Sequence, residues 1–388
     1  MKITRRVFAF LLVLCAPLLL LSSAPAENKA APKGQYLAYV GTYTTKTKSK
    51  GIYVFRYDAA TGKLSSLGLA AESADPSFVA VRPNGKFLYA VNEAGKSSMV
   101  SAFALDAKTG KLKPLNQLPA LGEDPCYLSF DKTGKIVLVA NYSSGNAAVF
   151  PILPDGRLGE HTALVQHTGS LGPNKERQEA PHAHWFETSP DNRFALAVDL
   201  GLDEVLVYKF DAAKGTLSPN DPPFEKLPPG SGPRHIAFRP DGNFLYVISE
   251  LRSTVTTFHY VKGTGILHEI QTVSTLPKEF GGRNDTAEIT VHPSGKFLYA
   301  SNRGHDSIAI FAIEPEKGTL TFTARVLTGG KEPRHFTIDP SGNYLLAENQ
   351  LSNSVVVFKI DLANGGLTPT GQVTEVPSPV DLTFVAAE

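Results

Sequence analysis

A short turn that recurs at nearly constant spacing constrains this chain more than any other feature of its sequence. Most copies begin with proline, and all of them end with glycine or asparagine. Proline fixes φ at one position of a turn, and glycine or asparagine accepts the positive φ that another position needs. The six copies lie at 83–85, 132–134, 190–192, 240–242, 293–295 and 340–342.

The spacing of these turns predicts the size of a structural unit. The last residues of successive copies lie 49, 58, 50, 53 and 47 residues apart. Each turn joins two segments of alternating apolar residues, which are typical of strands, and no long stretch shows helical periodicity. Four strands in a repeat of about 50 residues are what one blade of a β-propeller needs. The sequence therefore predicts an all-β propeller.

The two ends of the chain carry unmatched pieces of the repeat. The segment before the turn has a seventh copy at 379–384 (PVDLTF) that no turn follows. The segment after the turn has an extra copy at 36–43 (YLAYVGTY) that no first segment precedes. The two pieces complete each other, so we predict a seven-bladed propeller whose ring is closed by the C-terminal strand pairing into the N-terminal blade. An open β-solenoid is the alternative, but a closed ring removes exposed sheet edges.

Residues 1–26 have the composition of a secretory signal peptide. A basic start that includes Arg5 and Arg6 precedes an apolar run, and Ala-Pro-Ala at 24–26 fits a small-residue cleavage site. The run is short for a spanning helix, and an uncleaved anchor is the alternative. The paired arginines resemble a twin-arginine signal, while the run also suits the general secretory route. We therefore expect an exported protein, either periplasmic or extracellular.

After this leader we expect a polar tether at 27–34 and a single propeller domain at 35–388. Without residues 1–26, the chain has 35 lysines and arginines and 37 aspartates and glutamates, a net charge of −2. This balance provides no basic field, so we expect no nucleic-acid partner, no stable membrane insertion after removal of the leader, and a monomer. Cys126 is the one cysteine outside the leader, which excludes an internal disulfide and favours a buried apolar thiol.

Two stretches depart most from the repeat, at 166–180 and 218–232. Both are rich in proline, glycine and charge, and we expect them to be long loops. Loops on a rigid scaffold often carry binding and catalytic residues, so these two are candidates for added function.

Polar residues gather at one end of the predicted hairpins, where the first strand begins and the second ends. First strands line the centre of a propeller, so these side chains should converge on one mouth of a central channel, whereas the opposite end carries only generic turns. Five residues recur in most blades and are expected to tie the blades together: Asn92, Asn141, Asp199, Asn302 and Asn349. The stronger functional candidates do not recur or are cationic: His182, His184, Arg234, Glu250, Glu288, Arg303, His305 and Arg334. His235 and His335 recur as a pair, and both a structural and a functional role are open for them.

Four segments carry a resemblance to a known family: 178–208 (QEAPHAHWFETSPDNRFALAVDLGLDEVLVY), 232–250 (GPRHIAFRPDGNFLYVISE), 287–311 and 333–350. The chain after the leader resembles the lactonase seven-bladed propeller family along essentially its whole length. That family includes the cytoplasmic 6-phosphogluconolactonase of some bacteria and the fungal carboxymuconate lactonising enzyme. In the family, a histidine, two arginines and a glutamate at the channel mouth are proposed to carry catalysis. The resemblance places these roles on Arg234 of GPRH, Glu250, Arg303 of NRG, and either His182 or His184 of PHAH.

The chemistry of lactone opening is compatible with these residue types. A histidine polarised by a carboxylate can activate water, one arginine can stabilise the oxyanion, and another can hold a carboxylate or phosphate. The resemblance therefore implies a carboxylic ester hydrolase of carbohydrate metabolism that opens a small anionic lactone of the sugar-acid type, as 6-phosphogluconolactonase does. The expected substrate-binding residues are Glu288, His305, Arg334, His235 and His335. No spacing matches a metal motif or a G-x-S-x-G elbow, and we expect neither a metal nor a cofactor.

Two other functions remain open at this stage. The first is a non-enzymatic propeller that binds a ligand or a protein partner, because fold does not dictate function. The second is a carboxymuconate-type cyclase, which would use the same site toward ring closure. The export signal also separates this chain from a cytoplasmic sugar-phosphate pathway, so an extracytoplasmic sugar lactone or another acidic lactone is as compatible as a phosphorylated one. A lone tryptophan and the absence of a Trp-Asp signature argue against a WD-repeat scaffold.

Overall fold

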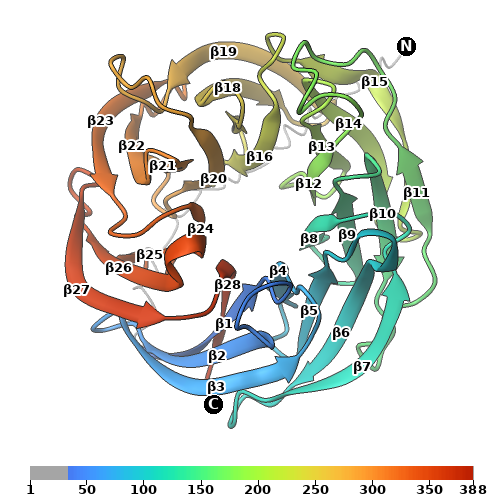
Figure 1. The fold of residues 1–388 in the computed structure, drawn as a ribbon. Helices are drawn as coiled ribbons and strands as arrows, with labels where there is room; N and C mark the ends of the chain where they lie inside the picture. Colours follow the sequence, from blue (N-terminus) through green and yellow to red (C-terminus); the bar gives the residue numbers. More distant parts are fainter. Residues whose placement is uncertain (1–33, 388) are drawn as a thin grey trace, which may run out of the picture. The chain divides into compact units, whose positions relative to one another are not determined.

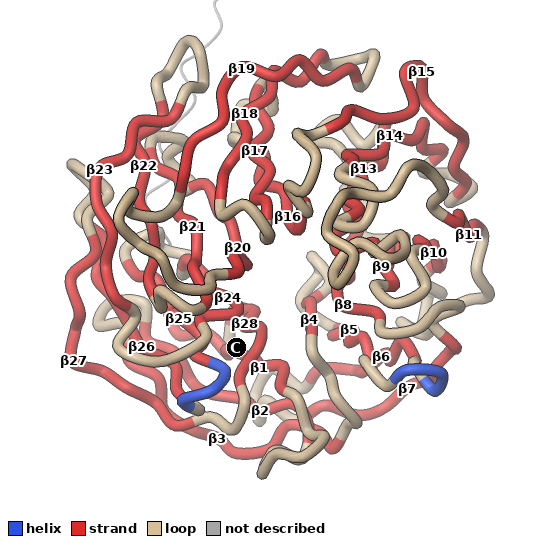
Figure 2. Tube along the Cα trace, turned by 45° about the horizontal axis from the view of Figure 1, so that its top comes forward, coloured by secondary structure: helices blue, strands red, loops and turns tan. Residues whose placement is uncertain are grey.

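The computed structural model describes residues 34–387, which form seven four-stranded antiparallel sheets arranged as a ring (Figure 1). The predicted seven-bladed all-β propeller is confirmed. The predicted signal peptide at 1–26 and the tether at 27–34, except for its last residue, lie outside the described residues. Within the described part, the two helices are single turns, η1 (Gly95–Ser97) and η2 (Gln350–Ser352), which stand out among the strands in Figure 2. Neither is long or apolar enough to cross a membrane.

The first strand of each blade lies nearest the centre of the ring (Figure 1). These strands are β4 (Phe78–Val81), β8 (Pro125–Phe130), β12 (Ala183–Thr188), β16 (Pro233–Phe238), β20 (Asp285–Val291), β24 (Pro333–Ile338) and β28 (Pro379–Ala386). The second strands are β5 (Phe87–Asn92), β9 (Ile136–Asn141), β13 (Phe194–Asp199), β17 (Phe244–Ser249), β21 (Phe297–Arg303), β25 (Tyr344–Asn349) and β1 (Gln35–Thr42).

The third and fourth strands complete each blade toward the outside of the ring. The third strands are β6 (Met99–Leu105), β10 (Asn146–Pro151), β14 (Glu204–Asp211), β18 (Thr254–Val261), β22 (Ser307–Ile313), β26 (Ser354–Ile360) and β2 (Gly51–Asp58). The fourth strands are β7 (Leu112–Pro119), β11 (Ala163–Gln166), β15 (Thr216–Lys226), β19 (Ile266–Ser274), β23 (Leu320–Leu327), β27 (Leu367–Glu375) and β3 (Lys63–Glu72).

The ring closes as the unmatched end segments predict. β28 pairs antiparallel with β1, with Tyr36 opposite Ala386 and Tyr39 opposite Thr383, in the sheet order β28-β1-β2-β3. The last described strand therefore supplies the innermost strand of the blade that the N-terminal strands begin. β1 therefore has a hydrogen-bonded partner on each side, β28 and β2, and is not left as an open edge.

Neighbouring blades are held together by apolar side chains and by a recurring tyrosine. Seven buried apolar clusters lie between and within the blades. The tyrosine of the second strand donates its hydroxyl hydrogen to a glycine carbonyl in an outer turn of the next blade. This contact is seen from Tyr89 to Gly156 (2.7 Å), from Tyr246 to Gly318 (3.0 Å) and from Tyr299 to Gly365 (2.9 Å). The tyrosine of the recurring F-L-Y segment thus forms a hydrogen bond between neighbouring blades.

The recurring polar residues have the structural role that the sequence predicts for them. The side-chain amide of Asn92 donates to the Ala74 carbonyl (2.6 Å), and that of Asn141 donates to the Ala120 carbonyl (3.0 Å). Each bond fastens the end of a second strand to the segment that enters the same blade. Asp199 instead accepts a hydrogen bond from the His182 backbone N–H (2.8 Å). β12 begins at Ala183, directly after this contact.

One of the two predicted loops is largely a strand. Residues 218–226 belong to β15, which pairs with β14 around an irregularity between Leu206 and Tyr208. The prolines of this stretch misled the prediction, because an outermost strand has one side without ladder bonds and tolerates proline there. The other predicted loop is confirmed apart from its first residue, since β11 ends at Gln166 and β12 begins at Ala183.

Candidate active site

Glu250 is the centre of a charged cluster where the first strands begin and the second strands end. The residue directly follows β17, and its carboxylate meets arginines from three separate segments. Arg234 of β16 brings Nε to 3.1 Å from Oε2, and Arg303 at the end of β21 brings Nη2 to 3.0 Å from the same atom. Arg177, from the loop between β11 and β12, hydrogen-bonds to Oε1. The two oxygens of Glu250 are thus surrounded by guanidinium groups.

Backbone carbonyls hold two of these arginines in place. Arg234 donates from Nη1 to the Ala287 carbonyl (2.8 Å), and its side chain is only 2 % exposed. Arg303 donates to the carbonyls of Asp285 and Thr286 (3.2 Å each) and is 8 % exposed. Its Nη1 has only a distant contact with Glu332, at 3.7 Å. Arg303 therefore has more hydrogen-bonding capacity left for a ligand than Arg234.

The arginines keep Glu250 ionised. Burial alone would raise the pKa of its carboxyl group, but the charges of Arg303, Arg234 and Arg177 lower that pKa to about 2. The expected pairing of Glu250 with a histidine is not found, because arginines engage both of its oxygens. We therefore assign it the role of a charged anchor that fixes three guanidinium groups, and not that of a partner for a general base.

The carboxylate that accompanies a histidine here is Glu179. Its Oε1 lies 3.1 Å from Nε2 of His182, and Nδ1 of the same ring lies 3.1 Å from the Tyr142 carbonyl oxygen. The imidazole also stacks on the Tyr142 ring, with centroids 4.4 Å apart and planes inclined by 14°. Both ring nitrogens of His182 therefore face oxygen atoms.

His184 has a different environment. Its ring lies edge-on between Tyr142 (5.6 Å between centroids) and His235 (5.1 Å), and its Nδ1 is buried without a hydrogen-bond partner among the described residues. Burial and the charges of Arg234 and Arg334 lower the pKa of His184 well below its usual value. His184 is therefore a neutral, packed ring at neutral pH.

Arg334 is the fourth arginine of this mouth. Its guanidinium lies over the Tyr43 ring, 5.4 Å from the centroid, and the Tyr43 hydroxyl donates to Oε2 of Glu93 (2.7 Å). Within the described part of the chain, no carboxylate lies within salt-bridge distance of Arg334. A cavity of about 570 Å³ opens beside Tyr43 and Glu93. Arg334 thus combines a fixed position with an unsatisfied charge.

Three other predicted residues lie deeper in the centre of the ring. Nδ1 of His235 is 2.8 Å from Oε2 of Glu288, and Nε2 of His335 is 3.3 Å from the same oxygen. Burial raises the pKa of Glu288 to about 8, against the influence of Arg234, whereas burial and nearby arginines lower the pKa of His335 to about 3. These contacts join neutral groups. His235, Glu288 and His335 form a cluster, here called the floor, beneath the arginines. Their mutual contacts agree with a structural role for the two histidines.

The floor continues into two further carboxyl groups. Oε2 of Glu348 lies 3.0 Å from Nδ1 of His335, within hydrogen-bond distance. Oδ1 of Asp381 lies 3.4 Å from Nε2 of the same histidine. Burial raises the pKa of Asp381 to about 7, and burial with neighbouring carboxylates raises the pKa of Glu348 well above its usual value. No group of three or more His, Cys, Asp or Glu side chains between residues 34 and 387 is arranged to hold a metal ion.

His305 is the predicted residue that the structure does not bring to the cluster. Its Nδ1 bonds to the Ser307 hydroxyl (2.8 Å) and its ring packs edge-on against Phe280 (5.0 Å), in the turn after β21. Sequence reasoning missed several residues that do belong to the mouth: Arg177, Glu179, Tyr142, Tyr43 and Glu93. For Arg177 and Glu179 the signal was present, since both lie in the long loop that was marked as a candidate for added function. Cys126 is buried and free, as expected.

The comparison with protein families decides what this arrangement belongs to. The model of the family described as "Lactonase, 7-bladed beta-propeller" matches residues 37–384. The chain belongs to this lactonase family. The match spans all seven blades.

Several relatives of this lactonase are similar over most of their length. The 6-phosphogluconolactonase of Bacillus subtilis (strain 168) is 40% identical over 300 residues, which cover 77% of this chain and 84% of the relative. The crystal structure of a putative 6-phosphogluconolactonase from Bacteroides fragilis NCTC 9343 is 41% identical with a TM-score of 0.85, covering 91% of this chain and 98% of that one. The periplasmic gluconolactonase of Pseudomonas aeruginosa is 36% identical with a TM-score of 0.86, covering 92% and 100%. The prediction of an enzyme, a carboxylic ester hydrolase of the lactonase type, is confirmed.

Proposed function

We propose that this lactonase hydrolyses a small anionic lactone of the sugar-acid type at the mouth that contains Glu250. The observation that carries the proposal is Arg334, whose guanidinium is held over the Tyr43 ring and has no carboxylate within salt-bridge distance in the described part of the chain. An arginine in this position suits a phosphate or carboxylate group of a substrate. The names of the B. subtilis and P. aeruginosa relatives support a sugar-acid lactone.

The remaining residues divide the chemistry of ring opening among them. Arg303 has the more accessible guanidinium, and we assign it the developing negative charge on the lactone carbonyl oxygen. Arg234 is buried and acts as a positioning residue that, with Arg177, fixes Glu250 and thereby Arg303. The arginine cluster thus provides a positive electrostatic potential that is in place before the substrate binds.

His182 is the residue we assign to proton transfer. With its Nδ1 hydrogen donated to the Tyr142 carbonyl, Nε2 takes a proton from the water that attacks the carbonyl carbon. The carboxylate of Glu179 then stabilises the protonated ring. When the ester bond breaks, the proton passes to the former ring oxygen, and the products are a hydroxyl group and a carboxylic acid that ionises in water.

The arginine assignments are tested by acid release in a pH-stat with glucono-δ-lactone and its 6-phosphate. We expect the wild type to exceed the spontaneous rate. Arg303→Ala should lower kcat about 10²- to 10³-fold on both lactones, the size of the loss when an oxyanion donor is removed. Arg334→Ala should lower kcat/KM at least about tenfold on the phosphate alone. Arg193→Ala, an exposed arginine away from this mouth, is the matched control.

Two results would contradict these roles. Wild-type rates in Arg303→Ala would remove that residue from the reaction. An equal loss on both lactones in Arg334→Ala would show that it does not bind the anionic substituent. No acid release from either lactone, with product formation from a carboxymuconate, would assign the site to a cyclase.

The histidine assignment has its own test. His182→Asn should lower kcat by about 10²- to 10⁴-fold, the usual contribution of general acid–base catalysis, with little change in KM. His184→Asn should retain most of kcat in the fraction of protein that folds, because its ring serves packing. Single-turnover rates on the folded, gel-filtered variants provide the measurement. The reverse order of losses would move the proton-transfer role to His184.

We also propose that the mature enzyme acts outside the cytoplasm. The leader-like composition of residues 1–26 and the similarity to a periplasmic gluconolactonase support this placement. Fractionation of cells that express the full chain, with Arg5 and Arg6 both replaced by lysine in a parallel strain, would test the location and the route.

A further inference from the structure

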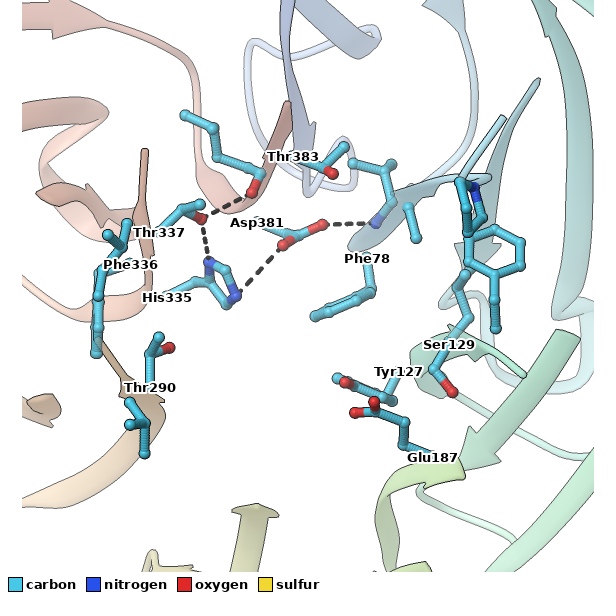
Figure 3. Close-up of a pocket in the computed structure, with 18 of the residues that line it drawn as sticks. Phe78, Tyr127, Ser129, Glu187, Thr290, His335, Phe336, Thr337, Asp381 and Thr383 are labelled. Carbon is cyan, nitrogen blue, oxygen red and sulfur yellow. Dashed lines mark hydrogen bonds and ion pairs between the residues drawn. The ribbon is translucent and has the colours of Figure 1, made fainter. Parts of the chain in front are cut away.

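The opposite mouth of the ring contains a second cavity, although the sequence predicted only generic turns there. Its volume is about 580 Å³, and Figure 3 shows it in close-up. The lining includes Pro83, Lys132 and Pro293, which begin the turns between first and second strands. Glu250 and its arginines lie at the other ends of these strands. The cavity therefore opens at the opposite end of the ring from Glu250, although His335 and Asp381, which lie beneath the arginines, also line its inner end.

The repeat places one polar side chain from each of five inner strands at the same level of this cavity. Ser129, Glu187, Thr290 and Thr337 each stand three residues before the first residue of their turn. Thr383 of β28 occupies the corresponding place in the closing strand, opposite Tyr39 in the ladder. All five line the cavity. The result is a ring of four hydroxyl groups and one carboxylate drawn from five blades.

Several of these oxygens are available to a ligand. No described residue forms a hydrogen bond with the hydroxyls of Thr290 and Thr383. Ser129 and Thr337 donate to the carbonyls of Phe186 and Leu382 (2.7 Å each). The Ser129 oxygen can still accept a hydrogen bond, whereas the Thr337 oxygen also lies 3.4 Å from Nδ1 of His335. In Figure 3, Thr290 and Thr337 face Ser129 and Glu187 across the cavity.

An aromatic surface lies at the inner end of the cavity. The rings of Phe78 and Tyr127 pack with centroids 4.5 Å apart and an interplanar angle of 46°. His335 and Asp381 complete this inner end, at 3.4 Å from each other (Figure 3). Apolar ring faces beside hydroxyl and carboxyl oxygens suit a molecule that has C–H groups and hydroxyls on opposite sides.

The charges of the cavity differ from those of the arginine mouth. Its exposed cation, Lys132, is paired with Glu187 at 2.9 Å, and Asp381 adds a further carboxyl group. The cavity therefore offers no unpaired cation to an anionic ligand, whereas its oxygens can accept hydrogen bonds from hydroxyl groups.

We propose that this turn-side cavity is a second binding site, for a neutral polyhydroxy compound of about monosaccharide size. Hydroxyls of Thr290 and Thr383 and the Glu187 carboxylate exchange hydrogen bonds with the ligand hydroxyls, and the C–H face of the ligand packs on Phe78 and Tyr127. The site is distinct in position and in charge preference from the lactone site.

The chain contains its own reporter for this site. Trp185 is the one tryptophan of the sequence. Its ring centroid lies 5.6 Å from that of Tyr127, which lines the cavity. Occupation of the cavity is therefore expected to change the fluorescence of a single, identified residue.

The experiment is a titration of the purified protein with D-glucose and with myo-inositol, followed by Trp185 emission. We expect a saturable change with at least one of these neutral compounds. The double variant Thr290→Val and Thr383→Val, which keeps side-chain shape and removes two hydroxyls, should weaken binding at least about tenfold. Thr321→Val on the outer strand β23 is the matched control and should bind as the wild type does.

Arg303→Ala separates this site from the lactone site. Glucose binding should be unchanged in that variant, and sodium gluconate should bind to it at least about fivefold more weakly than glucose, since the cavity has carboxyl groups and no unpaired cation. The absence of any saturable response to either neutral compound would overturn the proposal. So would full binding by the double valine variant, or loss of glucose binding in Arg303→Ala.

Discussion

At the scale of single residues, the candidate active site depends on one buried carboxylate. Glu250 is 3 % exposed and lies among Arg177, Arg234 and Arg303. Removing its charge would leave three guanidinium groups close together with no anion between them. A buried charge that loses its partner is strongly destabilising, so the site and the fold around it share the same requirement.

The first prediction at this scale concerns Glu250→Gln. We expect it to lower the free energy of unfolding by about 3–5 kcal/mol, the usual cost of breaking a buried ion pair from one side. Urea denaturation at pH 7 provides the measurement. Glu179→Gln is the control, because the Glu179 side chain is 55% exposed and its loss should cost under about 1 kcal/mol. Equal losses in the two variants would contradict the anchoring role.

The sequence located most of these residues but not their partnerships. Arg234, Glu250 and Arg303 could be placed at one mouth because strand ends follow from the repeat. Which carboxylate met which histidine could not be predicted, because Glu179 and Arg177 reach the mouth from a loop that has no repeat to fix its path. His305 was misplaced for a related reason: the turn after β21 directs it toward Phe280.

At the scale of elements, the inner strands explain both the success and the limits of the sequence reading. Alternating apolar residues and regular turns predicted a first and a second strand for every blade, and both strands are present in all seven. The fourth strands were harder, because they are half exposed and tolerate polar residues and proline. β15 shows this, since its run of prolines reads as a loop and forms an outer strand.

The sequence also predicts which side chains of the inner strands stand at the same height in the ring. Three residues before four of the six turns stand Ser129, Glu187, Thr290 and Thr337, and their shared position follows from the printed sequence alone. Their convergence on a cavity could not be predicted, because it depends on how widely the ring opens at that end.

At the scale of the whole molecule, buried titratable groups from several blades meet at the centre of the ring. Asp381 on β28 accepts from the Val79 backbone N–H of β4 (2.7 Å) and faces His335 of β24. Glu288 of β20 faces His235 and His335, with Glu348 and Arg234 nearby. Burial raises the pKa of Asp381 from 3.8 to about 7 and that of Glu288 from 4.5 to about 8.

These raised pKa values predict that the ring loses stability as pH rises from about 4 to about 8. Between the unfolded and folded pKa values the native state binds more protons than the unfolded chain, so stability falls as pH rises. We expect the contribution of these groups to the free energy of unfolding to decrease by up to about 1.4 kcal/mol per pH unit for each group in this range, and to stop changing above about pH 8, where both states are ionised. Urea midpoints at constant ionic strength provide the measurement.

The variant Asp381→Asn tests the source of this slope. The amide keeps an oxygen for the Val79 N–H and cannot ionise, so the decrease with pH should become shallower. Asp361→Asn, at an exposed turn, should leave the slope as it is. If the free energy of unfolding of the wild type did not fall with pH, or if the slope in Asp381→Asn were unchanged, the carboxyl groups of Asp381 and Glu288 would not control the dependence of stability on pH.

The pairing of β28 with β1 also sets an order of events during synthesis. The blade that begins with β1 lacks its innermost strand until residues 379–386 have left the ribosome, although β1 is the first strand made. For nearly the whole of translation, β1 therefore presents free backbone donors and acceptors. A chaperone or an export receptor has that interval in which to engage the chain before it can close on itself.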